Sequence, residues 1–578
     1  MGDLIQSTAL FKKIKLIYPD SRVTLLITTD FAEIAPFLPY VDEIKPVDMR
    51  GLTEFLKSNN FEFTVEVLRA LNKMFDGILS VKYDLAVNLS HDEFSVYFLY
   101  ILNSLKNIGI SITREGTIIS NDKMISYMFS AVKNRKVSVL NLVDIYERCL
   151  NSGDKIHVNK IFLDAENINN LSGRLDGTNK EKENNNVLNI LKENGIDDGD
   201  VLISFAIGAS TSLKKWRYDY FTELAKMLLA GNPKIKVILF GADYDVEAGN
   251  YIETSVANDR LINLTGKTSV SDLVYLVKRC RLLITHDTGT MHIGVATGVK
   301  LIVIYTGNVG FWETGPYSEN QVLVVPDIGC FPCDFNLKCL NPVCKNLIKP
   351  EYIYGMAEMI LKNTPAENYG QILSKYKDCG IIPYISRLDS KKFIDFLPAV
   401  KGKLNFKDLK LKILKIALEH FYEEDFWEID ENEINLFLDC FEAVEYNLSL
   451  DISEELKVVD NMIALCESGM TETKKMVDLA LNDPLDADKI NKPTMNIKSI
   501  DFELKYLSSI YDELSLFNQI HVINQSSSVS YDLFGLAVDS LKSYSRYKLQ
   551  LNIFKKVSVK FLDKIRERFD IKNMEEQI

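Results

Sequence analysis

The sequence has no long apolar run, since none of its hydrophobic stretches reaches the roughly 18 residues that a bilayer-spanning helix needs. Its first residues lack the charged and then apolar pattern of a signal peptide. No basic block stands out, and a net charge of −13 argues against a nucleic-acid binder, because phosphates need cationic partners. We therefore expect a cytoplasmic protein with no transmembrane segment and no nucleic-acid partner.

The cysteines do not form the pattern of a disulfide framework. Five of the nine are spread along the chain, which fits reduced thiols in cores. The other four lie together in GCFPCDFNLKCLNPVC, at Cys330, Cys333, Cys339 and Cys344. Four thiolates this close in sequence can converge on one tetrahedral ion, and with no open coordination position the site would be structural. The ligand set alone favours zinc; a reduced or disulfide-linked loop is the alternative.

The length and composition suit a soluble chain of several domains. Of 578 residues, 47% are hydrophobic and 25% charged. A polar stretch at 168–198 is the predicted linker between domains at 1–167 and 199–365. After a connector at 366–400, apolar residues recur every three or four positions, which predicts an all-helical domain at 401–578.

The stretch LLITHDTGTMHIGVATGVKLIVIYTG at 282–307 reads as strand, polar loop, helix and strand. In a parallel α/β sheet, ligands lie beyond the carboxyl ends of the strands, where helix N-termini attract anions. The candidate ligand-binding residues at this end are Asp287, Thr288, Gly289 and His292. Asp287 or Thr288 could cap the helix, and Gly289 would let a ligand approach the backbone. The alternative is a capped helix with a buried histidine.

A second candidate ligand-binding loop follows the strand in VLISFAIGASTSLKKWR at 201–217. Small residues there, including Ser210, leave room for a phosphate, and Lys214 supplies a point charge for it. Between the two stretches lies KVILFGADYDVEAG, in which Asp243 is a weaker candidate. Asp198 and Asp200 precede a strand and read as a turn rather than a metal site, so we expect no catalytic divalent metal.

Four motifs in order, GASxxxKxW, LFGADxD, INLTGKTS and THDTGTMHIGVATG, resemble glycosyltransferase family 9, the heptosyltransferase family. The opening MGDLIQSTAL, followed by YPDSRVTLL, resembles the acceptor-side domain of that family, so the resemblance covers roughly residues 1 to 365. It implies a GT-B fold of two Rossmann-like domains, here followed by the helical domain. In the family a strand precedes the Gly2-Asp3 pair; we expect that strand upstream of the given start, or a genuine truncation.

The resemblance implies an inverting transfer of heptose from ADP-heptose to a hydroxyl of the lipopolysaccharide core or of a protein. Family positions make Asp3 the general base and Ser210 and Lys214 the diphosphate contacts. They place Asp287, Thr288, Gly289 and His292 at the sugar or phosphates, and Asp243 at the ribose. Comparable cysteines occur in relatives that glycosylate autotransporter proteins, where the resemblance implies iron.

Other functions fit the same motifs. One alternative is a catalytically impaired sugar-nucleotide-binding scaffold, and another is a transferase using a different nucleotide sugar. A redox module built on the cysteine cluster is disfavoured, because the thiols would be consumed as ligands. The sequence leaves open the acceptor, the sugar, the metal, the oligomeric state, peripheral contact with the inner membrane and the role of 401–578.

Overall fold

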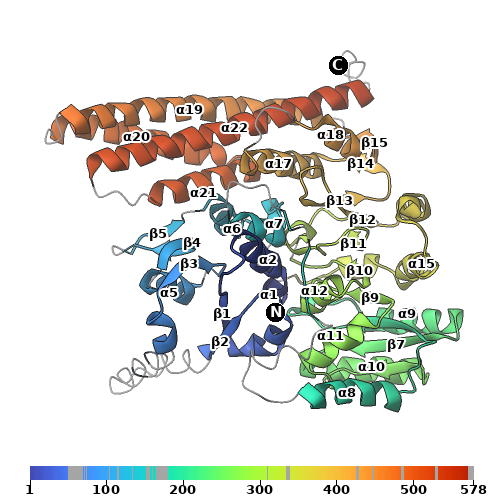
Figure 1. The fold of residues 1–578 in the computed structure, drawn as a ribbon. Coiled ribbons are helices and arrows are strands. Elements are labelled where there is room, and N and C mark those ends of the chain that lie inside the picture. Colours follow the sequence, from blue (N-terminus) through green and yellow to red (C-terminus); the bar gives the residue numbers. More distant parts are fainter. Residues whose placement is uncertain are drawn as a thin grey trace. The chain divides into compact units, whose positions relative to one another are not determined.

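The computed structural model describes the chain except residues 50–68, 70, 71, 73, 74, 91, 103, 114, 115, 121, 133, 151–156, 159, 165–179, 309, 334–338, 425–428, 446, 447, 483–486, 528–531 and 570–578, and except the side chains of 180–185, 487 and 488. The chain divides into two compact units (Figure 1). Unit 1 contains Met1–Ile78 and Asn141–Val400, and unit 2 contains Leu79–Leu140 and Lys401–Ile578.

Unit 1 is built around an eight-stranded sheet of order β13-β12-β11-β10-β9-β6-β7-β8. Strands β6 to β11 pair in parallel, and β12 and β13 extend the sheet in antiparallel pairing. The strands are β6 Val201–Ala206, β7 Ile235–Phe240, β8 Leu261–Asn263, β9 Leu282–Thr285, β10 Lys300–Ile304, β11 Val322–Pro326, β12 Ile381–Leu388 and β13 Ile394–Pro398. This order brings the carboxyl ends of β9, β6 and β7 together at one edge.

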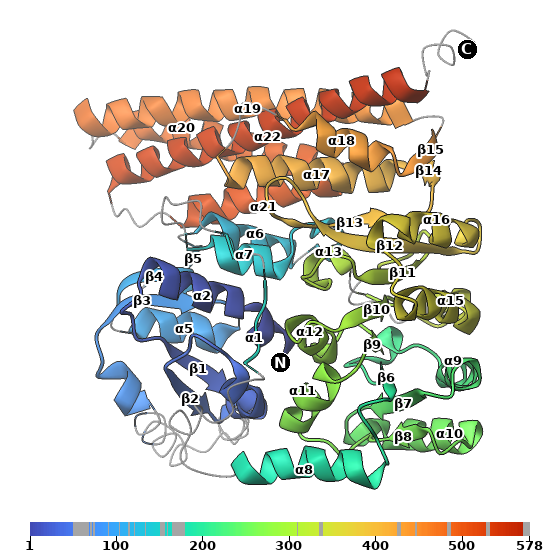
Figure 2. The same ribbon diagram turned by 45° about the vertical axis from the view of Figure 1, so that its right-hand side comes forward.

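Helices cover both faces of this sheet (Figure 2). Neighbouring strand residues alternate between two cores: Phe205 is buried in one and Ala206 in the other. Strands buried on both faces must be almost continuously apolar, which explains the runs seen in the sequence. One face packs against α9 Tyr218–Gly231, α10 Val246–Val256, α15 Pro350–Leu361 and α16 Tyr369–Leu373; the other packs against α8 Lys180–Glu193, α11 Val270–Lys278, α12 Gly289–Ala296 and α13 Phe311–Thr314.

The first part of unit 1 follows the predicted alternation of helices and strands. Its elements are α1 Gly2–Gln6, α2 Thr8–Ile17, β1 Thr24–Thr28, the 3₁₀ helix η1 Thr29–Phe37 and β2 Glu43–Val47, and α7 Leu142–Arg148 joins them later in the chain. Strands β1 and β2 pair in parallel. Pro36 lies within the 3₁₀ helix η1, and the Gly2-Asp3 pair is helical.

The segment predicted as a connector, 366–400, is instead part of the sheet. It contributes α16, β12 and β13, with Leu323 of β11 opposite Tyr384 and Ile385 opposite Leu397. The sequence IIPYISRL of β12 is rich in β-branched and aromatic residues, which suits a strand next to a buried neighbour. The antiparallel pair therefore continues the predicted donor domain beyond residue 365.

Unit 2 combines a small sheet with long helices. The sheet has the order β3-β4-β5, with β3 Tyr83–Asn88, β4 Ser104–Ile112 and β5 Ile118–Ser120, and carries α5 Glu93–Ile101, α6 Lys123–Ala131 and the 3₁₀ helix η2 Arg135–Val137. The later elements are β14 Gly402–Leu404, α17 Phe406–Tyr422, α18 Glu431–Leu438, β15 Phe441–Val444, α19 Leu448–Asn482, α20 Ala487–Ser508, α21 Asp512–Ser526 and α22 Leu533–Phe569. The region is thus helical as predicted except for the parallel β14–β15 pair. Among the described residues, no helix is both long enough and apolar enough to span a membrane.

Residues 79–140 belong to the same unit as the helical region because polar contacts join them. The backbone N–H of Ser120 donates to Ser527 Oγ at 2.8 Å, and Asn134 Nδ2 donates to Asp512 Oδ1 at 3.1 Å. Helix α21 packs against α6 and β5. These contacts link segments about 400 positions apart. The compact units divide at 400/401, where the helical domain was predicted to begin, but also at 78/79 and 140/141 rather than at 167.

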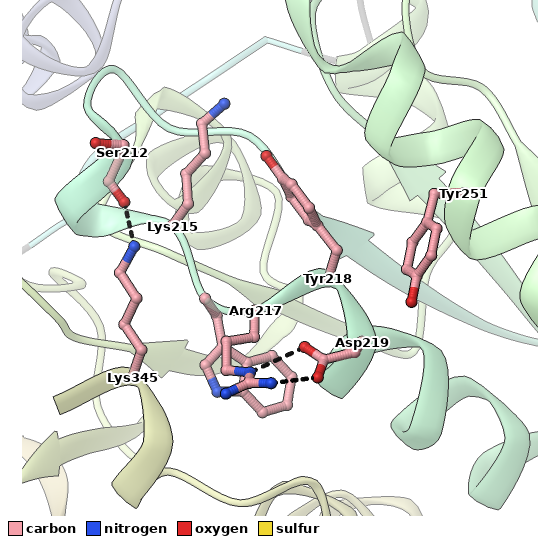
Figure 3. Close-up of a pocket in the computed structure, with 8 residues that line it drawn as sticks. Ser212, Lys215, Arg217, Tyr218, Asp219, Tyr251 and Lys345 are labelled. Atoms are coloured by element: carbon pink, nitrogen blue, oxygen red, sulfur yellow. Dashed lines mark hydrogen bonds and ion pairs between the residues drawn. The ribbon is translucent and has the colours of Figure 1, made fainter. Parts of the chain in front are cut away.

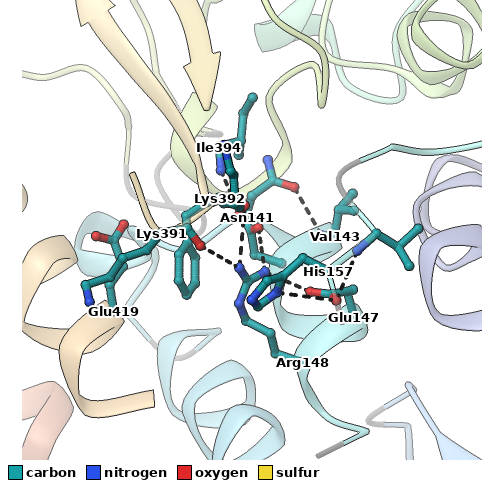
Figure 4. Close-up of polar contacts among 12 residues, drawn as sticks. Asn141, Val143, Glu147, Arg148, His157, Lys391, Lys392, Ile394 and Glu419 are labelled. Carbon is teal, nitrogen blue, oxygen red and sulfur yellow. Dashed lines mark hydrogen bonds and ion pairs between the residues drawn. The ribbon is translucent and has the colours of Figure 1, made fainter. Parts of the chain in front are cut away.

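A buried ion cluster ties α7 to the turn before β13 within unit 1 (Figure 4). Arg148 donates to Asp144 Oδ1 at 3.0 Å and to Glu147 Oε2 at 2.9 Å. Its other terminal nitrogen donates to the carbonyls of Lys391 and Lys392 at 3.2 and 3.4 Å. One guanidinium therefore neutralises two buried carboxylates and satisfies two carbonyl groups.

Replacing Arg148 by methionine should lower the free energy of unfolding by about 3 kcal/mol or more, because it removes a cation that bonds to two buried carboxylates, of which Glu147 retains Lys13 at 3.3 Å. The matched control is Arg22→Met, which removes an exposed arginine that pairs with Glu43 at 3.1 Å; its effect should stay below about 1 kcal/mol. Urea unfolding followed by circular dichroism measures both. Equal effects of the two substitutions would contradict the role given to the buried cluster.

Candidate functional site

The predicted donor residues gather at the carboxyl edge of the unit 1 sheet. Ser210 follows β6, Asp243 follows β7 and Asp287 follows β9, and these three strands are neighbours in parallel pairing. Ser210 and Asp243 have exposed side chains. The predicted strand, loop and helix around Asp287 are present as β9, the loop 286–288 and α12.

The Asp287 carboxylate holds two other elements in place. Its Oδ2 accepts a hydrogen bond from Lys214 Nζ at 2.8 Å, and its Oδ1 accepts one from Thr314 Oγ1 at 2.8 Å. The side chains of Asp287 and Lys214 are only 9% and 15% exposed. Asp287 thus joins the loop after β6 to the end of α13.

His286 also holds the loop after β6 in place. Its Nε2 accepts a hydrogen bond from the backbone N–H of Trp216 at 2.8 Å, and its Nδ1 lies 3.3 Å from the carbonyl oxygen of Gly208. A carbonyl can only accept, so this geometry calls for the neutral tautomer with its proton on Nδ1. The pKa of His286 is lowered to about 4, mainly by burial and also by nearby lysines, while the Gly208 hydrogen bond opposes the shift.

Helix α12 begins at the site, with Thr288 as its N-cap residue. The Thr288 side chain makes no capping hydrogen bond, and its hydroxyl is among the buried polar atoms for which the structure gives no partner. A Cβ on Gly289 would lie 2.6 Å from the Met1 methyl carbon, so the backbone comes close to the first residue here. The helix terminus therefore retains, among the described side chains, a buried hydroxyl without a partner beside the backbone N–H groups of its first turn.

Helix α1 packs against α12 and brings Asp3 to the donor residues. A Cβ on Gly2 would lie 2.9 Å from His292 Cδ2, and the exposed Asp3 is close enough to affect the imidazole. Burial lowers the pKa of His292, while the charges of Asp287 and Asp3 oppose that shift. His292 Nδ1 is buried, with no hydrogen-bond partner among the described residues. The predicted base and two predicted donor residues thus lie in one neighbourhood.

Asp245, the last residue of the LFGADxD motif, was not among the predicted site residues but has a clearer structural role than Asp243. It is buried, pairs with Lys215 Nζ at 2.6 Å and accepts the backbone N–H of Ala242 at 3.1 Å. A Cβ at Gly208 would clash with its carboxylate, so glycine is needed where the β6 loop passes this group. Asp245 therefore locks the loop after β7 to the loop after β6.

A pocket of about 560 Å³ borders the outer side of the β6 loop (Figure 3). It is lined by Ser212, Lys215, Trp216, Arg217, Tyr218, Asp219, Tyr251 and Lys345. Its cations already have partners: Arg217 bonds to Asp219 at 2.9 Å, and Lys345 bonds to the Ser212 carbonyl at 2.5 Å. None of the predicted donor residues lines this pocket, which is therefore a neighbour of the candidate site rather than part of it.

The four clustered cysteines lie near one another. Burial is the main cause that raises the pKa of Cys333, followed by Cys330, Cys344 and Cys339. Within the described residues, no three side chains of the metal-binding kinds take up a ligating arrangement, and 334–338 lie outside those residues. The other three thiols are thus near enough to affect Cys333, whereas metal binding stays a prediction.

Two residues important for this geometry were not predicted. Thr314 and Asp245 act through contacts with residues 27 and 30 positions away in the sequence. For Asp245 the available signal was its position just before a helix, which favours an acidic residue. For Thr314 the sequence offered no comparable local signal.

The neutral His286 predicts a pH-dependent stability. An unfolded histidine has a pKa near 6.5, whereas folded His286 titrates near 4, so only the unfolded state gains a proton between these values. Stability should be constant above pH 6.5 and fall by about 2 kcal/mol between pH 6.5 and 5. Urea unfolding of the unaltered chain and of His286→Asn over this range tests it. The variant should show a flatter dependence, and identical slopes would refute the assignment.

Comparison with known proteins finds similarity to one family over part of unit 1. The sequence profile of "Glycosyltransferase family 9 (heptosyltransferase)" matches residues 170–343. Lipooligosaccharide heptosyltransferase 2 of Campylobacter jejuni is 32% identical over 173 residues, which are 29% of this chain and 53% of that protein. The heptosyltransferase 2 of Haemophilus influenzae is 24% identical over 328 residues, or 56% of this chain and 85% of that protein.

The chain thus spans about half the length of the Campylobacter relative that it matches. Lipopolysaccharide heptosyltransferase 2 of Salmonella typhimurium is 35% identical over a match that covers 30% of that protein and 18% of this chain. The solved structure of Escherichia coli ADP-heptose lps heptosyltransferase II aligns with a TM-score of 0.44 and 17% identity, covering 63% of this chain and 97% of that chain. The part of the chain that is similar to glycosyltransferase family 9, residues 170–343, includes the predicted donor residues at the carboxyl edge of the sheet.

Proposed function

We propose that the chain transfers a heptose from ADP-heptose, with inversion, to a hydroxyl of a lipopolysaccharide core. The observation that carries this proposal is the packing of α1, the helix of Asp3, against α12, the helix of His292, at the edge where Asp287 holds Lys214. The matched relatives are heptosyltransferases by name. A protein acceptor and another nucleotide sugar remain the alternatives. The GT-B arrangement and the cytoplasmic location expected from the sequence are part of the same proposal.

The diphosphate of the donor would bind at the end of α12 and beside Lys214. Negative charge grows on the leaving diphosphate as the sugar–phosphate bond breaks, so a fixed cation and backbone N–H groups lower the barrier. Asp287 keeps the Lys214 ammonium in place at 2.8 Å before the donor arrives. Ser210, exposed after β6, and the partnerless Thr288 hydroxyl supply further hydrogen bonds.

Asp3 would take the proton of the acceptor hydroxyl as its oxygen attacks the sugar carbon. A general base must be ionised and accessible, and Asp3 is an exposed carboxylate on the element that faces α12. His292, buried and with its Nδ1 lacking a partner among the described residues, would bind the donor sugar or phosphate. Asp243 would bind the ribose hydroxyls.

The cysteine cluster would hold a structural iron or zinc ion. Three thiols lie close enough to raise the pKa of Cys333, and four thiolates are a suitable ligand set for either ion. No step of the transfer passes through this ion in the proposal, and we propose no catalytic metal elsewhere.

The central test separates donor binding from transfer. Calorimetry should show binding of ADP-heptose in preference to UDP-glucose and GDP-mannose. Lys214→Ala should weaken ADP-heptose binding about 10- to 100-fold through loss of charge-assisted hydrogen bonds, whereas the exposed Lys226→Ala should leave it unchanged. Asp3→Asn should keep donor affinity and lower kcat about 100-fold or more. Donor binding without transfer to any lipopolysaccharide core would instead support the scaffold alternative.

The metal proposal predicts one iron or zinc ion per chain in protein purified without chelator, measured by elemental analysis. Cys344→Ser, at the buried thiol, should remove the ion. The matched control is Cys379→Ser, a cysteine outside the cluster, which should retain it. A full complement of free thiols together with no bound ion would rule the site out.

A further inference from the structure

Helix α20 of unit 2 is apolar on two opposite faces. Its inner face buries Ile500 and Leu504 in the helical bundle. Its outer face carries Met495, Phe502 and Tyr506, whose side chains are 71%, 76% and 65% exposed. Because each residue advances about 100° around a helix, positions 495, 502 and 506 fall on one line, and Leu504 lies on nearly the opposite side from Phe502.

This outer stripe departs from the usual pattern of a surface helix. Such a helix normally presents polar residues opposite its buried face, and a single exposed apolar residue needs no explanation. Here three large apolar side chains follow one another along the outer face, and Ile510 in the turn after the helix extends the line at 50% exposure. An aligned apolar stripe of this kind indicates a surface that another body covers.

The charges beside the stripe are mainly positive. Among the described side chains of α20, the exposed charged residues are Glu503 and the four lysines Lys489, Lys492, Lys498 and Lys505. Lys498 and Lys505 are seven residues apart, so they line the same flank of the stripe. This balance is the reverse of that of the whole chain, whose net charge is −13.

We infer that the outer face of α20 docks on a membrane surface rich in anionic phospholipids. Aromatic and apolar side chains enter the boundary between headgroups and acyl chains, and lysines on the flanks are attracted to anionic headgroups. A second copy of the chain fits this face less well, because α20 against α20 would bring lysines against lysines. This surface belongs to unit 2 and goes beyond the proposed transfer reaction.

Sedimentation of the full chain with vesicles tests the docking. The chain should bind vesicles of phosphatidylcholine containing phosphatidylglycerol and bind far less to phosphatidylcholine alone, with binding that weakens as salt is raised. The double substitution Phe502→Ser with Tyr506→Ser should weaken binding about tenfold or more through lost apolar burial. The double substitution Lys498→Glu with Lys505→Glu should also weaken binding, because the attraction to anionic headgroups is lost.

The matched control is Leu481→Ser with Val522→Ser, which removes two exposed apolar residues of the same unit outside the stripe; its binding should equal that of the unaltered chain. The four substituted positions of α20, two in the stripe and two lysines on its flank, are exposed. The variants should therefore fold, which circular dichroism checks. Unchanged vesicle binding by both stripe variants would overturn the inference. The inference would also be overturned if light scattering without lipid showed a dimer of the unaltered chain and a monomer of the Phe502/Tyr506 variant.

Discussion

The candidate site depends on one carboxylate that is shared between a lysine and a threonine. Asp287 accepts hydrogen bonds from both Lys214 and Thr314 and so fixes the loop after β6 relative to α13. Without this group the lysine would be a flexible chain at the surface, with a large entropy to lose on binding an anion. Its position at the end of a buried parallel strand makes the arrangement rigid.

The loop that carries this lysine is also fastened to the cysteine segment. Lys345 and Asn346, just after Cys344, bond to the carbonyl of Ser212 and to Arg217. The backbone N–H of Cys333 donates to the carbonyl of Gly307 at 2.9 Å. The cysteine segment and the donor loop therefore form one connected structure, so a change in the folding of one is transmitted to the backbone of the other.

The elements that the sequence predicted well are those with local signals. The β9–α12–β10 unit was evident because an apolar run, a polar turn and a second β-branched run are adjacent in the chain. The neighbourhood of Asp3 and His292 followed from family positions rather than from local pattern. The roles of Thr314 and Asp245 depend on contacts between separate loops, and nothing in the pattern near either residue encodes its partner. The antiparallel strands β12 and β13 were missed because their flanking region is polar and turn-rich.

The division of the chain into units has a consequence for dissecting this protein. The backbone passes between the units after residues 78, 140 and 400, so unit 1 is made of two stretches and unit 2 of two others. A fragment ending at residue 400 would keep β3, β4 and β5 but lose α21, against which β5 and α6 pack. Removing the helices is therefore not the removal of an appendage, because it uncovers β5 and α6, which lie in the first quarter of the chain.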